Sequence, residues 1–156
     1  MRRCLIGPAA GLVLVGCVGA ENMESHYPDA AAARRDGAFD RGWLPQFVPS
    51  DASDIWEWHN VSTNITWACF STPSGVEPVR AALLKEGGRR AEGAIGDGPT
   101  RFFLTRTWWP SSMSREGVEA YNLTENQRFG LRIGVDEGSR TICFHRCSVQ
   151  AACLGV

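Results

Sequence analysis

Residues 129–146 read FGLRIGVDEGSRTICFHR, and this stretch gives the clearest indication of the fold. Apolar residues occupy every second position from Phe129 to Val135 and return at Ile142 and Phe144. Such alternation is typical of a strand with one buried face. Residues 136–139 between the two runs are Asp-Glu-Gly-Ser, a turn composition. The pattern therefore predicts a β-hairpin near the end of the chain.

Two further strands are expected upstream of this hairpin. Residues 63–71 alternate so that Ile65, Trp67 and Cys69 share one side. Residues 100–109 alternate as well, and Pro110 ends the run because proline cannot donate to a sheet. Residues 89–99 and 111–126 are expected to be mostly loop.

Three segments carry helix signals. Residues 28–36 begin with a proline suited to a first helical position and contain four alanines. Residues 51–60 follow Ser50, a good N-cap, and the helical spacing places Ala52, Ile55, Trp56 and His59 on one face. Residues 77–86 end at a Gly-Gly pair. The predicted fold class is α+β, with two or three short helices packed on an antiparallel sheet that ends in the C-terminal β-hairpin.

Composition restricts the class of protein. A chain of 156 residues with 44% hydrophobic and 21% charged residues is long enough for one globular domain, which we place at residues 28–156. Sixteen basic residues against seventeen acidic ones leave a net charge of -1. Nothing in this balance points to a nucleic-acid partner.

The N-terminus has the pattern of an export signal. Arg2 and Arg3 precede an apolar run, residues 5–15, that is far shorter than the roughly 20 residues needed to span a bilayer. The run ends at Leu14-Val15-Gly16-Cys17, which resembles the bacterial lipobox. That resemblance implies a signal peptide over residues 1–16 and a lipid on Cys17, followed by a tether over residues 17–27. Val18 in place of an aspartate resembles the sorting pattern for the outer membrane. The alternative is an ordinary signal peptide that is cut later, near Ala20.

Several short motifs downstream resemble one family of small bacterial lipoproteins. They are Gly42-Trp43-Leu44-Pro45, Pro49-Ser50-Asp51-Ala52, Ile55, His59-Asn60 and Thr63-Asn64, followed by a strand that ends at Phe70. The chain is similar in these motifs to proteins with a YbbD head domain, and the likeness extends over about residues 28–146. Ser62 stands where the family pattern suggests an acidic residue. The resemblance implies no activity, ligand or site residue.

The cysteines predict disulfides. Four remain after the signal and the lipid site are set aside: Cys69, Cys143, Cys147 and Cys153. An even number in an exported chain favours bridges. Cys143 and Cys147 in one strand would lie about 13 Å apart, beyond the roughly 4.4–6.8 Å that a bridge allows. We prefer Cys69–Cys143 with Cys147–Cys153, and Cys69–Cys147 with Cys143–Cys153 remains open.

Zinc is the alternative use of the same residues. Cys143, His145 and Cys147 with Cys69 or Cys153 offer thiolate and imidazole ligands. Their spacing matches no strong zinc pattern, and an oxidising compartment disfavours thiolates. We therefore expect neither a metal nor another cofactor.

Catalytic signals are few. His59 lies near Asp54 and Glu57, but on a helix His59 and Glu57 would point in different directions, so a packed histidine is preferred to a hydrolase. His26 and His145 have no carboxylate at useful spacing in the sequence. Trp58 and Trp109 fall opposite their apolar neighbours and are the candidates for an exposed aromatic platform.

The sequence thus favours a lipid-anchored envelope protein without catalysis, which acts as a binding or structural module. We expect it on the bacterial outer membrane, at the periplasmic face or the cell surface, with an unknown envelope protein or glycan as its partner. The alternatives are a glycan binder or an inhibitor of a wall-degrading enzyme, and a hydrolase that uses His59.

Overall fold

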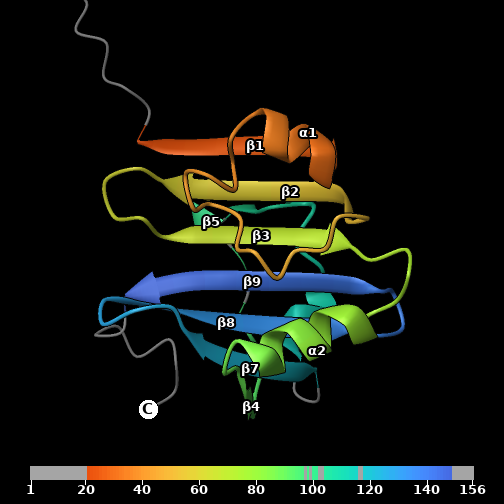
Figure 1. Cartoon of the computed structure of the whole chain (residues 1–156). Coiled ribbons are helices and arrows are strands. Elements are labelled where there is room, and N and C mark those ends of the chain that lie inside the picture. Colours follow the sequence, from red (N-terminus) through yellow and green to blue (C-terminus); the bar gives the residue numbers. More distant parts are fainter. Residues whose placement is uncertain (1–20, 97, 99, 102–103, 116–117, 149–156) are drawn as a thin grey trace, which may run out of the picture.

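The computed structural model describes residues 21–96, 98, 100–101, 104–115 and 118–148. Its main element is a sheet of seven strands in the order β1-β2-β3-β9-β8-β7-β4, and every neighbouring pair is antiparallel (Figure 1). The strands of this sheet are β1 (Asn22–Asp29), β2 (Ser53–Asn60), β3 (Thr66–Ser71), β4 (Arg89–Ala91), β7 (Glu119–Thr124), β8 (Phe129–Asp136) and β9 (Thr141–Ser148).

Little regular structure is added to the sheet. The helices are α1 (Ala30–Arg35) and α2 (Glu77–Lys85), and a short 3-10 turn, η1, spans Ser111–Ser114. The two-residue strands β5 (Thr100–Arg101) and β6 (Leu104–Thr105) pair only with each other.

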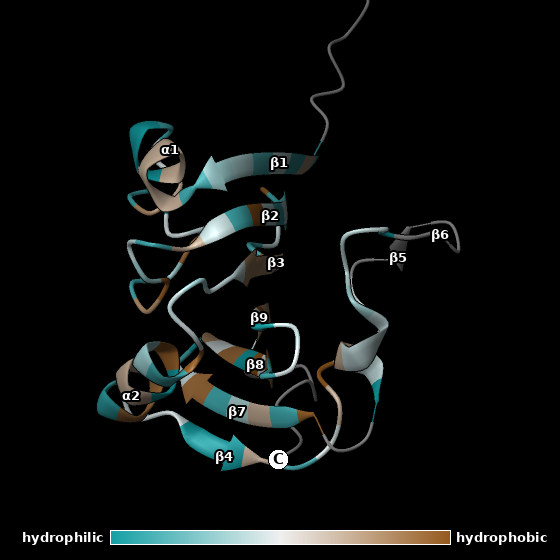
Figure 2. Ribbon diagram, turned by 90° about the vertical axis from the view of Figure 1, so that its right-hand side faces the viewer, coloured by the Kyte–Doolittle hydropathy of each residue, from teal (hydrophilic) through white to brown (hydrophobic). Residues whose placement is uncertain are grey.

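One face of the sheet, the helix-side face, is covered by α1, the loop of residues 36–52 and α2 (Figure 2). Strand residues Ile55, Phe70 and Phe144 point into this layer and are buried with the loop residues Leu44 and Phe47. The edge of the Phe47 ring packs on the face of Phe144, with the ring centroids 6.0 Å apart. This layer is the main hydrophobic core.

The other face, the arm-side face, is covered by the described residues between 92 and 118, here called the arm (Figure 2). Ile95, Trp109 and Met113 of the arm are buried against Cys69 and Cys143 of the sheet. Both faces of the seven-stranded sheet are therefore packed against a further layer of the chain.

The predicted α+β class is wrong. Seven antiparallel strands carry the structure, while the two helices have only six and nine residues, so the fold is mainly β. The structure does contain the predicted hairpin as β8 and β9, and it contains the helix expected at residues 77–86 as α2. Residues 28–36 form a shorter helix, α1, whose N-cap is Asp29.

The largest local error concerns residues 51–60, which are not a helix but the strand β2. The residues on its helix-side face are Ile55, Glu57 and His59, so two polar side chains occupy buried positions. They obscure the period of two that would have identified a strand. Asp54, with a φ of 49°, lies at the bulge where β2 shifts its register against β3.

The tether expected over residues 17–27 is also too long. Residues 22–27 lie in β1, which pairs with β2 from Asn22↔Asn60 to Asp29↔Ser53. The short strand β4 and the six-residue β7 lie within residues 89–99 and 111–126, which were expected to be mostly loop. In place of the single strand expected at residues 100–109, the structure has the two short strands β5 and β6, which pair with each other.

Candidate functional site

The arm-side face carries a continuous line of aromatic rings. His26 stacks on Trp56 with centroids 4.0 Å apart, and Trp56 lies parallel to Trp108 at 6.2 Å. Trp108 meets Trp109 edge to face at 6.0 Å. The line continues from Trp109 to Trp67 at 5.1 Å and ends where Trp67 stacks on His145 at 3.6 Å. We call these six residues the aromatic row.

Strand geometry explains how the row forms. In adjacent antiparallel strands, residues that pair directly project from the same face. His26 pairs with Trp56 across β1 and β2, and Trp67 pairs with His145 across β3 and β9. The arm then adds Trp108 and Trp109.

One end of the aromatic row is accessible and bordered by carboxylates. Asp54 Oδ1 lies 2.8 Å from His26 Nε2 and accepts a hydrogen bond from Trp56 Nε1 at 3.1 Å. Glu24 accepts a hydrogen bond from Trp108 Nε1 at 2.6 Å and forms an ion pair with Arg106 at 2.9 Å. The side chains of His26 and Asp54 are 44% and 65% exposed, so this end can meet a ligand.

A small hollow of about 150 Å³ adjoins this end. Its lining includes Asp54, Trp56 and Trp108. Its volume is below the roughly 300–1,000 Å³ of an enclosing ligand pocket, so it suits a ligand that lies across the surface.

The other end of the row belongs to the protein interior. Trp109 is only 5% exposed and donates a hydrogen bond to the carbonyl oxygen of Gly96 at 3.0 Å. The expectation that Trp109 is exposed is therefore wrong. Burial lowers the pKa of His145 to about 4, so the imidazole that stacks on Trp67 is neutral at pH 7.

Trp58, the other candidate for the platform, lies on the arm-side face next to the row. It pairs with Glu24 of β1 and Trp67 of β3 and is half-buried. The sequence patterns do not single out His26 or Trp56, because residues 17–27 resemble a tether and Trp56 shares the predicted buried face of a helix. Pairing between β1 and β2 brings His26 to a carboxylate, Asp54, that is 28 residues away.

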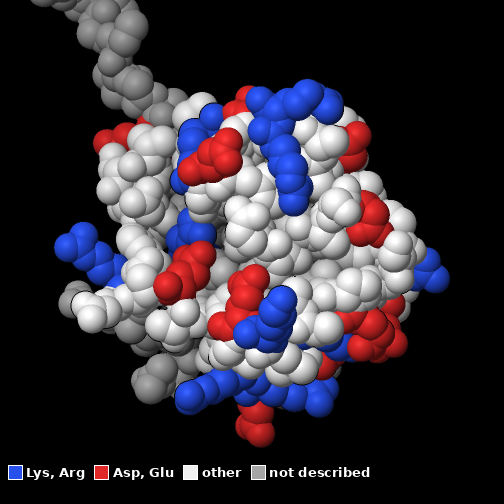
Figure 3. Space-filling view, in the orientation of Figure 1, with Lys and Arg blue, Asp and Glu red and all other residues white. Residues whose placement is uncertain are grey.

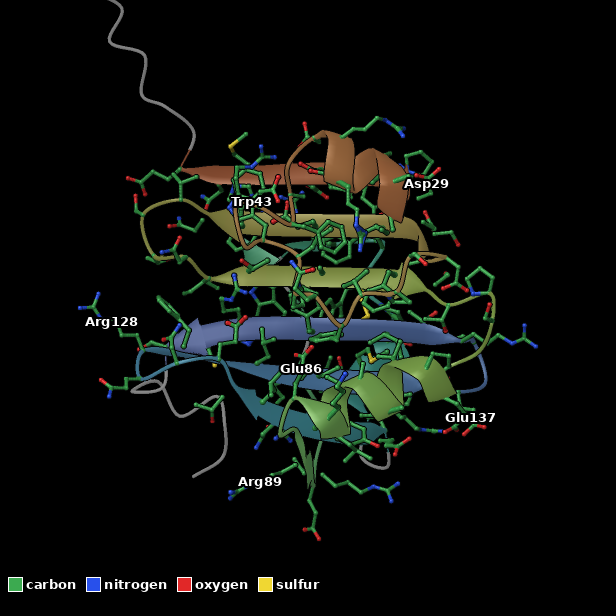
Figure 4. All side chains as sticks on the ribbon, in the orientation of Figure 1. Asp29, Trp43, Glu86, Arg89, Arg128 and Glu137 are labelled. Carbon is green, nitrogen blue, oxygen red and sulfur yellow. A yellow bond between two sulfur atoms is a disulfide. The ribbon has the colours of Figure 1, made fainter. Side chains whose placement is uncertain are left out.

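On the opposite face of the sheet, Glu57 and His59 form a buried pair. His59 Nδ1 lies 2.7 Å from Glu57 Oε1, and the two side chains are 0% and 1% exposed. They touch because residues two apart in a strand share a face, whereas the predicted helix would have separated them. The ring of Trp43, labelled in Figure 4, stacks on His59 at 3.7 Å, and the guanidinium of Arg41 lies over Trp43.

Burial governs the chemistry of this pair. It raises the pKa of Glu57 to about 8, against the opposing charges of Arg41 and Arg146, and lowers the pKa of His59. Within the described residues, Glu57 Oε2 and His59 Nε2 have no hydrogen-bond partner. The pair can hold one proton at neutral pH, but it lies beneath the loop and not in an open cleft.

Cys69 and Cys143 are joined by a disulfide across β3 and β9, with their Cα atoms 4.0 Å apart. This is the pair preferred from the sequence. Cys147 is buried in β9, while Cys153 and the lipidation candidate Cys17 lie outside the described residues. Because Cys143 is in a disulfide, its thiolate is not available to zinc. No group of three or more potential metal ligands occurs in the described part of the chain.

A hollow of about 560 Å³ lies between α2 and the arm. Its lining includes three arginines, Arg80, Arg90 and Arg115, and three acids, Glu119, Asp136 and Glu137, and Arg80 is paired with Glu119 and Glu137. Glu137 marks that end of the molecule in Figure 4. The hollow has no surplus charge for an ionic ligand.

The fold and these sites define a small mainly-β domain with an aromatic line on one sheet face and a buried acid–imidazole pair on the other. Residues 21–71 match the model of the YbbD head domain family. The resemblance found in the sequence is thus confirmed over β1, α1, β2 and β3. No curated protein and no solved structure matches the chain.

Proposed function

We propose that this chain is a lipid-anchored protein of the bacterial envelope, with a sheet domain that binds a partner and performs no catalysis. The lipobox-like stretch Leu14-Val15-Gly16-Cys17, in register behind Arg2 and Arg3 and an apolar run, carries the proposal. Diacylglycerol and an N-acyl chain on Cys17 would hold the protein stably, because each buried methylene contributes about 0.8 kcal/mol. No helix in the described ranges is long and apolar enough to span a bilayer.

The position of the first strand supports an anchored domain. β1 begins at Asn22, only five residues after Cys17. Five residues reach at most about 17 Å, so a lipid on Cys17 would hold the sheet next to the membrane surface. A Val follows Cys17, which favours the outer membrane as the destination.

Cell fractionation tests the anchor. The wild-type protein should sediment with the outer membrane and resist extraction by salt or urea, while detergent releases it. The Cys17→Ala variant should lose this behaviour. A wild-type protein released by salt alone would contradict the anchor.

An envelope glycan is the ligand that the accessible end of the aromatic row favours. Sugars present apolar C–H faces that stack on indole rings, and hydroxyls that donate hydrogen bonds to carboxylates. Trp56, Trp58 and Trp108 supply half-buried rings, and Asp54 and Glu24 supply acceptors beside them. An inhibitor of a wall-degrading enzyme would use the same surface for a protein partner.

Binding of the detergent-purified lipoprotein to purified peptidoglycan and lipopolysaccharide tests this ligand class. Trp56→Ala and Trp58→Ala should each weaken binding at least tenfold. Leu84→Ala is the matched control, because Leu84 is 60% exposed on α2, away from the row. Equal binding by all three variants would refute a glycan site on the row.

A hydrolase that uses His59 has less support. The carboxylate of Glu57 is within hydrogen-bond distance, as such a mechanism requires, but both side chains are buried. A general base must reach its substrate, and this pair is covered by the loop that carries Trp43. We therefore propose a structural role for the pair.

A further inference from the structure

At one end of the sheet, the β2–β3 loop lies beside the start of β1. Asn22 pairs with Asn60, and the Asn60 amide donates a hydrogen bond to Asn22 Oδ1 at 2.8 Å. The backbone N–H of Val61 donates to the carbonyl oxygen of Glu21 at 2.8 Å. The β2–β3 loop, residues 61–65, is therefore fixed beside the residues that lead back to Cys17. Figure 1 shows this loop and the start of β1 on the same side of the sheet.

The same end exposes apolar side chains. Val61 is 49% exposed and Met23 is 46% exposed. Within the described residues, only Leu84 on α2 is a further large apolar side chain with comparable exposure. Residues 61–65 contain no charged side chain. In Figure 3 the corresponding left edge of the molecule is largely white.

The backbone of the β2–β3 loop is already hydrogen-bonded within the protein. Asn60 Oδ1 accepts from the N–H groups of Ser62 and Thr63 and from the Thr63 hydroxyl, at 2.8–3.0 Å. Contact with a less polar medium therefore leaves few donors unpaired, which lowers the cost of removing this loop from water.

The loop before β8 adds a cation to this end. Arg128 is exposed, and it precedes the half-buried Phe129 at the start of β8. A hollow of about 340 Å³ lined by Thr63, Arg128 and Phe129 adjoins both loops. Figure 4 shows Arg128 projecting outward at this end. An exposed arginine next to apolar groups suits an anionic lipid surface. Glu21 and Glu125 are exposed acids nearby, and Glu125 is paired with Arg146.

We propose that this anchor-side end, formed by residues 21–23, 60–65 and 126–129, rests on the lipid headgroups. The inference rests on the proposed anchor at Cys17, and it adds an orientation: the strands run away from the membrane. Val61 and Met23 alone bind a bilayer weakly, but the tether makes their contact intramolecular and raises its effective concentration.

Paramagnetic broadening measures this orientation. The lipidated full-length protein, labelled with ¹⁵N, is placed in nanodiscs of phosphatidylethanolamine and phosphatidylglycerol that contain a gadolinium-headgroup lipid. Amide signals of residues 60–65 and 128–129 should broaden at least threefold more than those of residues 74–76 and 137–140. Equal broadening at the two ends, or stronger broadening at residues 137–140, would overturn the inference.

Variants separate the contact from the anchor. Val61→Asp and Met23→Asp should each at least halve the broadening at residues 60–65 while the protein stays in the nanodiscs. Leu84→Asp is the matched control and should change nothing. Retention with unchanged broadening in both variants would overturn the lipid contact alone. A wild-type protein that does not enter the nanodiscs would overturn both the anchor and this contact.

Discussion

His59 Nδ1 lies 2.7 Å from Glu57 Oε1 in a pair that solvent barely reaches. Two polar residues on the buried face of a strand are costly unless they satisfy each other. Their hydrogen bond and the ring of Trp43 over His59 make the pair part of the core. It also makes folding depend on pH.

Glu57 should cause stability to fall as the pH rises from about 6.5 to 8. The pKa of Glu57 is raised to about 8 in the folded protein, so its contribution is lost as the pH rises through that value. The pKa of His59 is lowered in the folded protein, so its contribution to stability is lost as the pH falls below about 6.5. Below that pH, the rise of stability with pH caused by His59 opposes the fall caused by Glu57. Above pH 6.5 only the Glu57 slope remains, at up to about 1.4 kcal/mol per pH unit.

Urea denaturation at pH 6.5, 7.25 and 8 measures this dependence. Glu57→Gln should remove the fall because it removes the titrating group and keeps an amide near His59. A wild-type free energy of unfolding that stays constant from pH 6.5 to 8 would contradict the raised pKa.

Reduction of the Cys69–Cys143 bridge should lower the free energy of unfolding by about 2–4 kcal/mol. The bridge closes 74 residues of chain and so restricts the unfolded state. Denaturation of the Cys69→Ser/Cys143→Ser double variant beside the wild type measures the loss. Full reactivity of both thiols in unreduced, denatured protein would show that the bridge is absent.

The two tryptophans singled out in the sequence should behave differently on substitution. Trp109→Ala removes a buried ring between the arm and the sheet and should cost about 3–5 kcal/mol. Trp58 is half-buried, so Trp58→Ala should cost clearly less. Denaturant midpoints decide the order, and a Trp109→Ala variant as stable as Trp58→Ala would be incompatible with the packing of the arm.

Gly134 allows the arm to pack on β8. A Cβ at this position would lie 2.7 Å from Met113 Sδ and 3.0 Å from Ile95 Cδ1. Gly134→Ala should therefore destabilise the protein by about 1–3 kcal/mol through overpacking. Gly138→Ala is the control, since its Cβ would meet only Asp136 Oδ1 at 3.5 Å. Similar thermal midpoints for the two variants would argue against the close contact.

The hairpin could be predicted because its buried face is purely apolar, from Phe129 to Phe144, and its turn is short. β2 could not, because Glu57 and His59 replace apolar residues at inward positions and the spacing of Ile55 and Trp56 mimics a helix. The sequence pattern of β1 is weak because Tyr27 is the one buried residue on this edge strand. Local sequence patterns therefore fail where a residue's environment is set by the strand that pairs with it.

The accessible end of the aromatic row was unpredictable for the same reason. His26 and Asp54 are remote in sequence and meet only through the pairing of β1 with β2. A single strand from residue 100 to 109 would place Trp109 opposite its apolar neighbours, on an exposed face. In the structure Trp109 lies beyond β6, in the part of the arm that turns back onto the sheet. The Cys69–Cys143 pair could be predicted because both of its strands show clear alternation of apolar residues.

The most direct test of the account is the intact mass of the N-terminal peptide of the mature protein purified from bacterial membranes. The account predicts a chain that begins at Cys17 and carries a diacylglycerol on its sulfur and an acyl chain on its amino group. The Cys17→Ala variant should carry no lipid. A wild-type peptide without lipid that begins after Ala20, or one that retains the leader, would contradict the anchor and the orientation inferred from it.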